Sequence, residues 1–345
     1  AYIWVIPEGL AETLDKFNPT GALHDEGIAA RAAAKALAMW KQYILINPVR
    51  VLKYNTNNAS GDADICLAYA PEILRGKYAG QAMKDLNAWH RRQHGKLDAG
   101  TREDMEKARR LGVLGSGFAV QEVEDVMKII PDERHLKNLL RGEKLNTLQK
   151  YWQNAREFTT WRENVLRLAA FRFFRDALKK GKRLYGASNP HEIDAITDLD
   201  EKAAKLAREL LGDYGNISAH GQYIRKRLLP FFSWMEINAP RYVYMMRNLR
   251  YESRGAGSGL RIAKVAAHKA VAGGVRFGLR ASLFFGAVML YNMIFWPDEE
   301  RELGESGRQQ LHIILGRRED GSIMTLRLQG ALSDALAWFD GEDLP

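Results

Sequence analysis

The sequence has 345 residues, 46% of them hydrophobic and 27% charged, a composition that excludes a disordered tail. A single cysteine, Cys66, excludes an internal disulfide and a zinc site built from several thiolates. The net charge of +9 is concentrated in one segment, because residues 220–280 hold twelve Lys and Arg against Glu236 and Glu252. Such a segment is expected to meet phosphates or an acidic partner. Cys66 lies in an apolar stripe, so we expect it to be a small buried residue.

Helical periodicity and start or stop signals predict an N-terminal helical region, residues 1–145. Its expected helices cover about 28–46, continue from Pro48 through Val51 and Tyr54, and cover 72–94. The segment 101–104 (Thr-Arg-Glu-Asp) resembles a capping box, so the next helix is expected to begin there. Glycines within 112–117 should interrupt that helix, and another short one should end before Pro131.

A long-helix region is predicted for residues 146–251. Apolar residues recur at helical steps from 146 to 180, which indicates one helix of unusual length. A second helix is expected over 217–250, with kinks or breaks at Pro230 and Pro240 because proline lacks the N–H that a helix needs. The Gly/Ser-rich segment 252–259 is the predicted linker that follows.

The C-terminal part is predicted to hold a basic, then apolar helix at 260–297 and a small unit at 298–345. In the latter, two apolar runs flank the turn Asp320-Gly321, which indicates a β-hairpin, and a short helix is expected at 331–339. The fold class expected for the whole chain is therefore mainly α: an elongated multi-helix assembly with long kinked helices and a small C-terminal β-hairpin.

No motif in the sequence supports a catalytic site, a metal site or a cofactor. The segment 112–117 (Gly-Val-Leu-Gly-Ser-Gly) lacks the spacing of a dinucleotide or P-loop motif, so it is interpreted as a helix break. His90 and His94 flank two arginines that would repel a cation. Glu236 lies among aromatic residues, where it is either an acid of raised pKa or, as we expect, a partner of Arg241 or another arginine.

The basic segment alternates cationic and aromatic residues. This pattern is typical of surfaces that bind single-stranded nucleic acid, of helices at a membrane interface, and of ordinary helices with one packed aromatic face. The candidate residues for binding nucleic acid or lipid headgroups are Arg225, Lys226, Arg227, Arg241, Arg247, Arg250, Arg254, Arg261 and Lys264.

The run 281–296 is uncharged and apolar. As a helix it would be about 24 Å long, short of the roughly 30 Å hydrocarbon core of a bilayer. It is therefore interpreted either as a plain core helix or as a helix that inserts into a membrane or an oligomer core. The candidate residues for membrane contact or helix packing are Leu283, Phe284, Phe285, Met289, Tyr291, Phe295 and Trp296.

Several segments of the sequence resemble a known protein family. Residues 212–218 (Gly-Asp-Tyr-Gly-Asn-Ile-Ser), 228–242 (Leu-Leu-Pro-Phe-Phe-Ser-Trp-Met-Glu-Ile-Asn-Ala-Pro-Arg-Tyr) and 312–338, together with 40–48 and 54–62, are similar to the large polyvalent protein associated domains of giant bacteriophage and mobile-element proteins. The similarity covers most of the chain. The matching motifs are structural and not catalytic, so the resemblance implies no catalytic residue in this chain.

The resemblance implies a structural, ejection-type virion protein, located in the virion and, after ejection, in the host cell envelope. Its expected partners are portal, tail or further ejection proteins in a hetero- or homo-oligomer, with DNA and membrane as further candidates. The alternative is a non-catalytic nucleic-acid-binding module of a giant phage-encoded polymerase or polyvalent protein. A third hypothesis, an enzyme built around Glu236, has only that residue in its favour.

Overall fold

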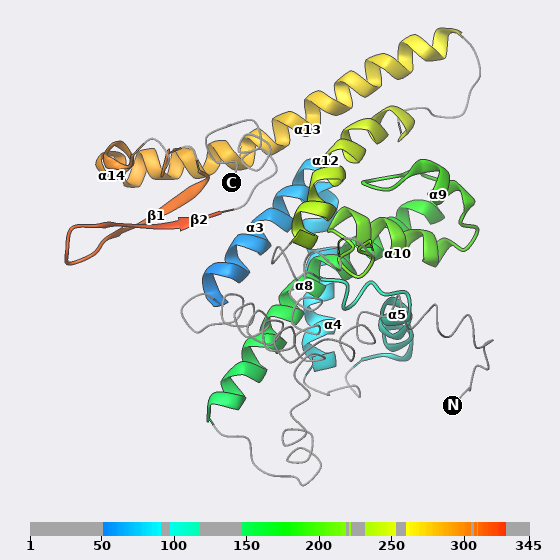
Figure 1. Cartoon of the computed structure of the whole chain (residues 1–345). Helices are drawn as coiled ribbons and strands as arrows, with labels where there is room; N and C mark the ends of the chain where they lie inside the picture. The colour runs from blue at the N-terminus through cyan, green and yellow to red at the C-terminus, as the bar shows by residue number, and fades with distance from the viewer. Residues whose placement is uncertain are drawn as a thin grey trace, which may run out of the picture.

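Helix α8 (Thr147–Lys179) runs through the middle of a helical body (Figure 1). This computed structural model describes residues 51–90, 97–117, 147–218, 221, 232–252, 260–304, 307–308 and 310–328. The mainly α fold with a C-terminal hairpin is confirmed. The helices predicted at 28–46, before Pro131 and at 331–339 lie outside the described residues.

The length of α8 follows from its sequence, as predicted. Its apolar residues recur on one side at helical spacing, and Leu168, Phe171 and Phe174 are fully buried. Gly181, two residues after the end of the helix, has a φ of 72°, which belongs to the left-handed region. There the N–H of Lys182 donates to the carbonyl of Ala177 (3.0 Å), which is the Schellman arrangement that glycine permits.

Shorter helices surround α8 and bury one continuous core. They are α3 (Val51–Tyr69), α4 (Gln81–His90), α5 (Ala99–Arg110), α9 (Pro190–Ala195) and α10 (Leu199–Leu210). Helices α3, α4 and α10 contact α8 directly. Cys66 of α3 is fully buried in this core, as predicted, and burial raises the pKa of its thiol.

Two predicted boundaries in this region are wrong. The single helix expected at 72–94 is divided into a 3₁₀ turn (Pro71–Leu74), a π-helical turn (Gly76–Gly80) and α4, because Arg75 between the turns is extended at φ −68° and ψ 154°. Helix α5 begins at Ala99 and not at Thr101. Asp98 is its cap and accepts a hydrogen bond from the N–H of Thr101 (2.8 Å), so the carboxylate does what the hydroxyl was expected to do.

Helix α12 (Phe232–Glu252) covers the later part of the second long helix that was predicted. It does not begin at Ile217, which lies in non-helical chain, and Pro230 lies outside the described residues. The break expected at Pro240 is absent, because α12 continues through it. Pro240 is exposed, a position where solvent can replace the lost backbone bond. Glu252, predicted as the first linker residue, is the last residue of α12.

Helix α13 (Leu260–Phe295) lies across one end of the body and contacts α3 and α12 (Figure 1). It is followed by α14 (Pro297–Glu302), which the sequence did not predict, and by strands β1 (His312–Arg317) and β2 (Ile323–Arg327). The strands pair antiparallel, with a register shift between Ile314 and Gly316. Their turn at Asp320-Gly321 confirms the predicted hairpin.

Candidate functional site

The inner face of α13 holds the hairpin. Phe284, Phe285 and Val288 are at one side of the helix and pack against apolar side chains of the hairpin. Those hairpin residues are Leu311, Ile313, Leu326 and Leu328. This small cluster is separate from the core around α8, so the hairpin is attached to the rest of the chain largely through α13, α14 and a smaller contact with α3.

The outer face of α13 is equally apolar but uncovered. Leu279, Leu283, Leu290 and Ile294 are 60%, 67%, 56% and 61% exposed. Their spacing of four, seven and four residues places them on one side of the helix. Val288 follows Leu279 by nine residues, roughly two and a half turns, so the inner and outer faces are opposite. A helix that is apolar all round is normally buried in a protein or a membrane.

The seven apolar residues predicted for membrane contact or packing differ in their exposure. Leu283, Tyr291 and Phe295 are exposed. Phe284 and Phe285 are half-buried against the hairpin, and Met289 and Trp296 are also half-buried. Within the described residues, Gly278–Phe295 is the one helical stretch whose length and mean hydropathy of 1.4 would suit a membrane span, and only 12% of it is buried.

Asn292 interrupts the apolar surface of α13 and fastens it to β1. Its side chain is fully buried; Nδ2 donates to the carbonyl of His312 (2.8 Å), and Oδ1 accepts from the N–H of Ile314 (3.0 Å). The amide thus satisfies a donor and an acceptor of the strand edge, as a neighbouring strand would. Asn292 therefore attaches the hairpin to α13 through two hydrogen bonds.

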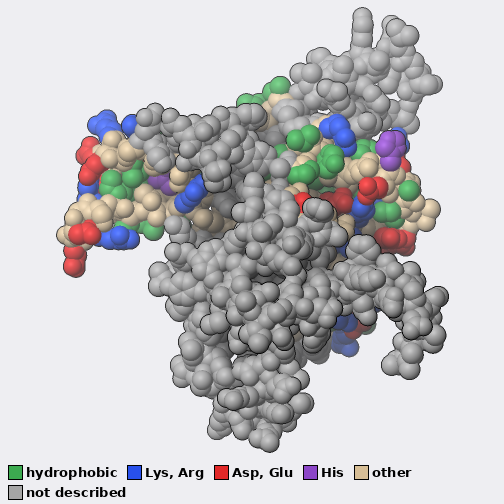
Figure 2. Space-filling model, in the orientation of Figure 1, with side chains coloured by type: hydrophobic (Ala, Val, Ile, Leu, Met, Phe, Trp, Pro, Cys, Tyr) green, Lys and Arg blue, Asp and Glu red, His purple; other side chains and the backbone are tan. Residues whose placement is uncertain are grey.

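A second contact joins the hairpin to α14. His312 Nε2 lies 3.1 Å from Glu300 Oε2, and both side chains are buried. His312 Nδ1 lies 2.6 Å from the carbonyl oxygen of Gln310, which can only accept, so Nδ1 carries a proton. Both ring nitrogens of His312 therefore have a hydrogen-bond partner. Figure 2 shows acidic and basic side chains mixed around the hairpin and α14, at the left of the view.

Asn292→Leu is expected to release the edge of β1 without unfolding the helical body. The substitution leaves the carbonyl of His312 and the N–H of Ile314 without their partner, and each unsatisfied buried group costs about 1–3 kcal/mol. Hydrogen exchange at the Ile314 amide should accelerate about 10- to 100-fold. Exchange in α8 should be unchanged. If the Ile314 amide exchanges as slowly in Asn292→Leu as in wild type, Asn292 does not hold the hairpin to α13.

Of the nine predicted binding residues, Arg241 and Arg247 have side chains that the structure describes. Arg241 is buried and faces the ring of Tyr242 (5.3 Å to the centroid), so it is not part of a surface site. Arg247 is exposed and lies over the ring of Tyr244 (4.8 Å). Arg250 belongs to α12, and Arg261 and Lys264 belong to α13. The remaining four, Arg225, Lys226, Arg227 and Arg254, lie outside the described residues.

Among the described residues, Glu236 is hydrogen-bonded to the backbone of Ser218. Its Oε1 accepts a hydrogen bond from the N–H of Ser218 (2.9 Å), whereas Arg241 is directed to Tyr242. A Cβ on Gly221 would lie 1.7 Å from Glu236 Oε2, so that glycine allows the close approach. Glu236 therefore anchors Ser218 to α12, whereas the ion pair expected with Arg241 is not formed.

The glycine-rich segment 112–117 is a helix break, as predicted. The N–H of Gly112 and of Val113 donate to the end of α5, and the N–H of Gly115 donates to Asn164 Oδ1 (3.2 Å). Because these amides have internal partners, they do not form a phosphate cradle. The described residues contain no group of three or more His, Cys, Asp or Glu arranged for a metal ion; His94 lies outside them.

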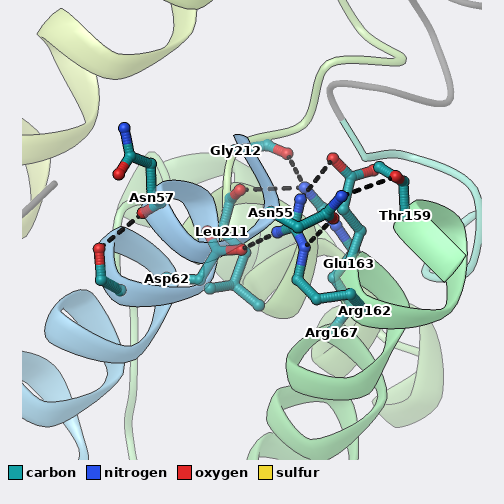
Figure 3. A network of polar contacts seen from close by, with 10 residues as sticks. Asn55, Asn57, Asp62, Thr159, Arg162, Glu163, Arg167, Leu211 and Gly212 are labelled. Carbon is teal, nitrogen blue, oxygen red and sulfur yellow. Dashed lines mark hydrogen bonds and ion pairs between the residues drawn. The ribbon is translucent and has the colours of Figure 1, made fainter. Parts of the chain in front are cut away.

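A polar network lies between α3 and α8 (Figure 3). Asn55 Nδ2 donates to Thr159 Oγ1 (2.9 Å), and Arg162 donates to Asn55 Oδ1 (3.1 Å) and to Asp62 Oδ2 (3.1 Å). Burial raises the pKa of the Asp62 carboxyl, and the positive charge of Arg162 offsets part of that rise. The network pairs its charges internally, which is the requirement for keeping them in a core.

Arg167 lies beside this network (Figure 3). Its side chain is buried; Nη1 donates to Ser116 Oγ (2.8 Å), and Nη2 donates to the carbonyls of Leu211 (3.0 Å) and Gly212 (2.8 Å). Those carbonyls follow the end of α10, where helix carbonyls lack intrahelical partners. One guanidinium thus joins α8, the glycine-rich segment and α10.

Glu252 makes a third buried junction. Its Oε1 accepts from Tyr69 Oη (2.6 Å) and from the N–H of Tyr185 (2.7 Å) and of Gly186 (2.9 Å). Burial raises the pKa of the Glu252 carboxyl, although these donors lower it in part. Asn248, one turn earlier on α12, donates to the carbonyl of Gly186 (3.0 Å), so the end of α12 holds the segment after α8 in place.

No family model, no curated protein and no solved structure matches the chain. The resemblance of residues 212–242 and 312–338 to large polyvalent protein associated domains therefore stays a prediction. The polar junctions at Arg167 and Glu252 use their charged groups to connect elements of the body. The outer face of α13, by contrast, carries apolar side chains that are more than half exposed.

Proposed function

We propose that this chain is a structural, non-catalytic region of a bacteriophage virion protein. It assembles with other virion proteins near the portal or tail, is delivered with the genome and helps DNA to cross the host envelope. The observation that carries the proposal is the outer face of α13, whose leucines are more than half exposed although the opposite face is already covered. A face of this kind suits a module that acts by joining another surface.

The interior of the helical body is consistent with this function. Arg162 and Arg167 hold α3, the segment 112–117 and the end of α10 on α8 through hydrogen bonds and an ion pair to Asp62. Their role is to fix the geometry of a rigid body from which α13 is presented. The resemblance to virion proteins supplies the biological setting of the proposal.

The test is the location of the chain during infection. Mass spectrometry of purified particles should detect peptides of this chain at a fixed ratio to the portal protein. Cell fractionation soon after infection should find it with the envelope. A chain that is found in the cytosol of infected cells and never in particles would overturn the proposal.

The alternative function, a nucleic-acid-binding module, has one structural observation in its favour. Arg247 and Tyr244 form an exposed cation–aromatic pair on α12, a combination that suits stacking on bases beside phosphates. This alternative predicts binding of single-stranded DNA that weakens steeply with salt. Fluorescence anisotropy with the purified chain and Arg247→Ala distinguishes it, because the virion proposal does not require that binding.

A further inference from the structure

We infer that α13 binds an anionic lipid surface while lying in the plane of the membrane. Its outer face enters the boundary between headgroups and acyl chains, and the hairpin on its inner face stays in water. The inference rests on the proposed function, because it names the surface that α13 of a delivered module contacts. It also differs from a transmembrane span, which the composition of α13 alone would suggest.

The charges of α13 complement an anionic surface. From Leu260 to Trp296 the chain has no acidic residue, and its basic residues all precede the apolar run. These are Arg261, Lys264, Lys269, Arg276 and Arg280. Acids reappear only in α14, with Asp298, Glu299, Glu300 and Glu302. Anionic headgroups attract a basic segment of this kind, and the attraction adds to the burial of an adjoining apolar face.

The exposed aliphatic side chains of the apolar run lie on the side of α13 away from the hairpin. Leu279, Leu283 and Leu290 are on the outer face. The aromatic pair Tyr291 and Phe295 (ring centroids 5.0 Å apart) is also exposed, but Phe295 follows Val288 by seven residues, so the pair lies at the margin of the inner face near the end of the helix. Aromatic rings at this position suit the depth of the headgroups. An uncovered apolar face opposite a face that the hairpin covers suits a helix that lies on a bilayer.

A transmembrane orientation conflicts with the inner face. The apolar window Gly278–Phe295 is about 27 Å long, less than the roughly 30 Å hydrocarbon core. Spanning would also carry the hairpin into hydrocarbon, or break both hydrogen bonds of Asn292 to β1. Arg317 of β1 forms ion pairs with Glu299 and Glu302 of α14 at the surface, and these charges would also have to enter the bilayer. The in-plane orientation keeps all these contacts.

Flotation with vesicles tests the partner. The purified chain should float with phosphatidylcholine vesicles that contain phosphatidylglycerol, and binding should fall about tenfold or more when phosphatidylglycerol is omitted or salt is raised. Leu283→Asp should reduce binding about 10- to 100-fold. The matched control is Leu52→Asp on α3, because Leu52 is 68% exposed and Leu283 is 67% exposed. Circular dichroism verifies that both variants stay folded.

Environment-sensitive labels test the orientation. The native thiol of Cys66 is buried, so single cysteines can be labelled selectively at Leu290→Cys on the outer face and Ser322→Cys in the hairpin turn. On vesicle binding, fluorescence at position 290 should shift to the blue and lose access to aqueous iodide. The label at position 322 should stay accessible to iodide outside the vesicle. Protection at both positions would indicate spanning and overturn the in-plane orientation.

The remaining outcomes also decide the inference. Absence of flotation with anionic vesicles at low salt overturns it, as does equal binding by Leu283→Asp and wild type. A change of oligomeric state in Leu283→Asp without lipid binding would assign the outer face to a second copy of the chain. Particle incorporation separates the two proposals, because a chain found in particles that binds no vesicles refutes the lipid inference alone.

Discussion

Replacing Arg167 with methionine is expected to lower the free energy of unfolding of the helical body by about 3–5 kcal/mol. The guanidinium is 3% exposed and donates to Ser116 Oγ and to the carbonyls of Leu211 and Gly212. Methionine fills a similar volume but leaves these three acceptors without a donor, and nearby Asp62 loses a compensating positive charge. Urea unfolding followed by circular dichroism at 222 nm measures the loss.

Two further variants make that result interpretable. Arg167→Lys keeps the positive charge but lacks the planar fork, so an intermediate loss of about 1–3 kcal/mol is expected. Lys180→Met removes an exposed cation at the end of the same helix and should change the free energy of unfolding by no more than about 0.5 kcal/mol. If Arg167→Met unfolds like wild type, the polar network is not structural and becomes a candidate for binding or catalysis.

Much of the helical architecture could be predicted from sequence because its cause is local. The apolar spacing of α8 and the stop at Gly181 are properties of neighbouring residues, as is the hairpin turn at Asp320-Gly321. Where two local signals competed, the prediction was wrong. Asp98 and Thr101 are both able to cap α5, and the carboxylate does so because it accepts the stronger, charge-assisted hydrogen bond.

The polar junctions could not be predicted because their partners are distant in the chain. Arg162 meets Asp62 across 100 residues, and Glu252 meets Tyr69 across 183. Neither residue is part of a recognisable motif; Glu252 lies at the start of a Gly/Ser-rich segment and looks like part of a linker. The sequence gives only a weak indication of the junction made by Glu252, namely an acidic residue one turn after Asn248 at the end of a predicted helix.

The two faces of α13 show what composition can and cannot predict. The sequence indicates an apolar run that suits a core, an oligomer or a membrane equally well. The structure divides that run, because Phe284 and Val288 pack on the hairpin while Leu283 and Leu290 stay exposed. The division depends on the position of a hairpin that follows more than twenty residues later. It also depends on Asn292, a polar residue within the apolar run whose role is explained only by its hydrogen bonds to β1.

Replacing Glu252 with alanine is expected to destabilise the junction of α12 with α3 by about 2–4 kcal/mol. Tyr69 Oη and the N–H groups of Tyr185 and Gly186 all lose their common acceptor. Glu252→Gln should retain most of the stability, since the two lone pairs of the amide oxygen can still accept from these donors. Thermal unfolding and hydrogen exchange at Gly186 measure both changes. Equal unfolding of Glu252→Ala and wild type would contradict the junction.

The glutamine variant also gives Glu252 a pH signature whose sign is fixed by its burial. Because burial raises the pKa of the carboxyl above its usual value of 4.5, the native state keeps a proton that the unfolded chain has released. Stability from this group is therefore fully present below pH 4.5 and is lost as pH rises through the folded pKa. Wild type should lose stability relative to Glu252→Gln over that interval.

Measuring the difference in unfolding free energy between wild type and Glu252→Gln isolates the effect of Glu252 from that of Asp62, because burial raises the pKa of Asp62 in both proteins. A difference that is constant with pH would show that the carboxyl is ionised in the junction throughout.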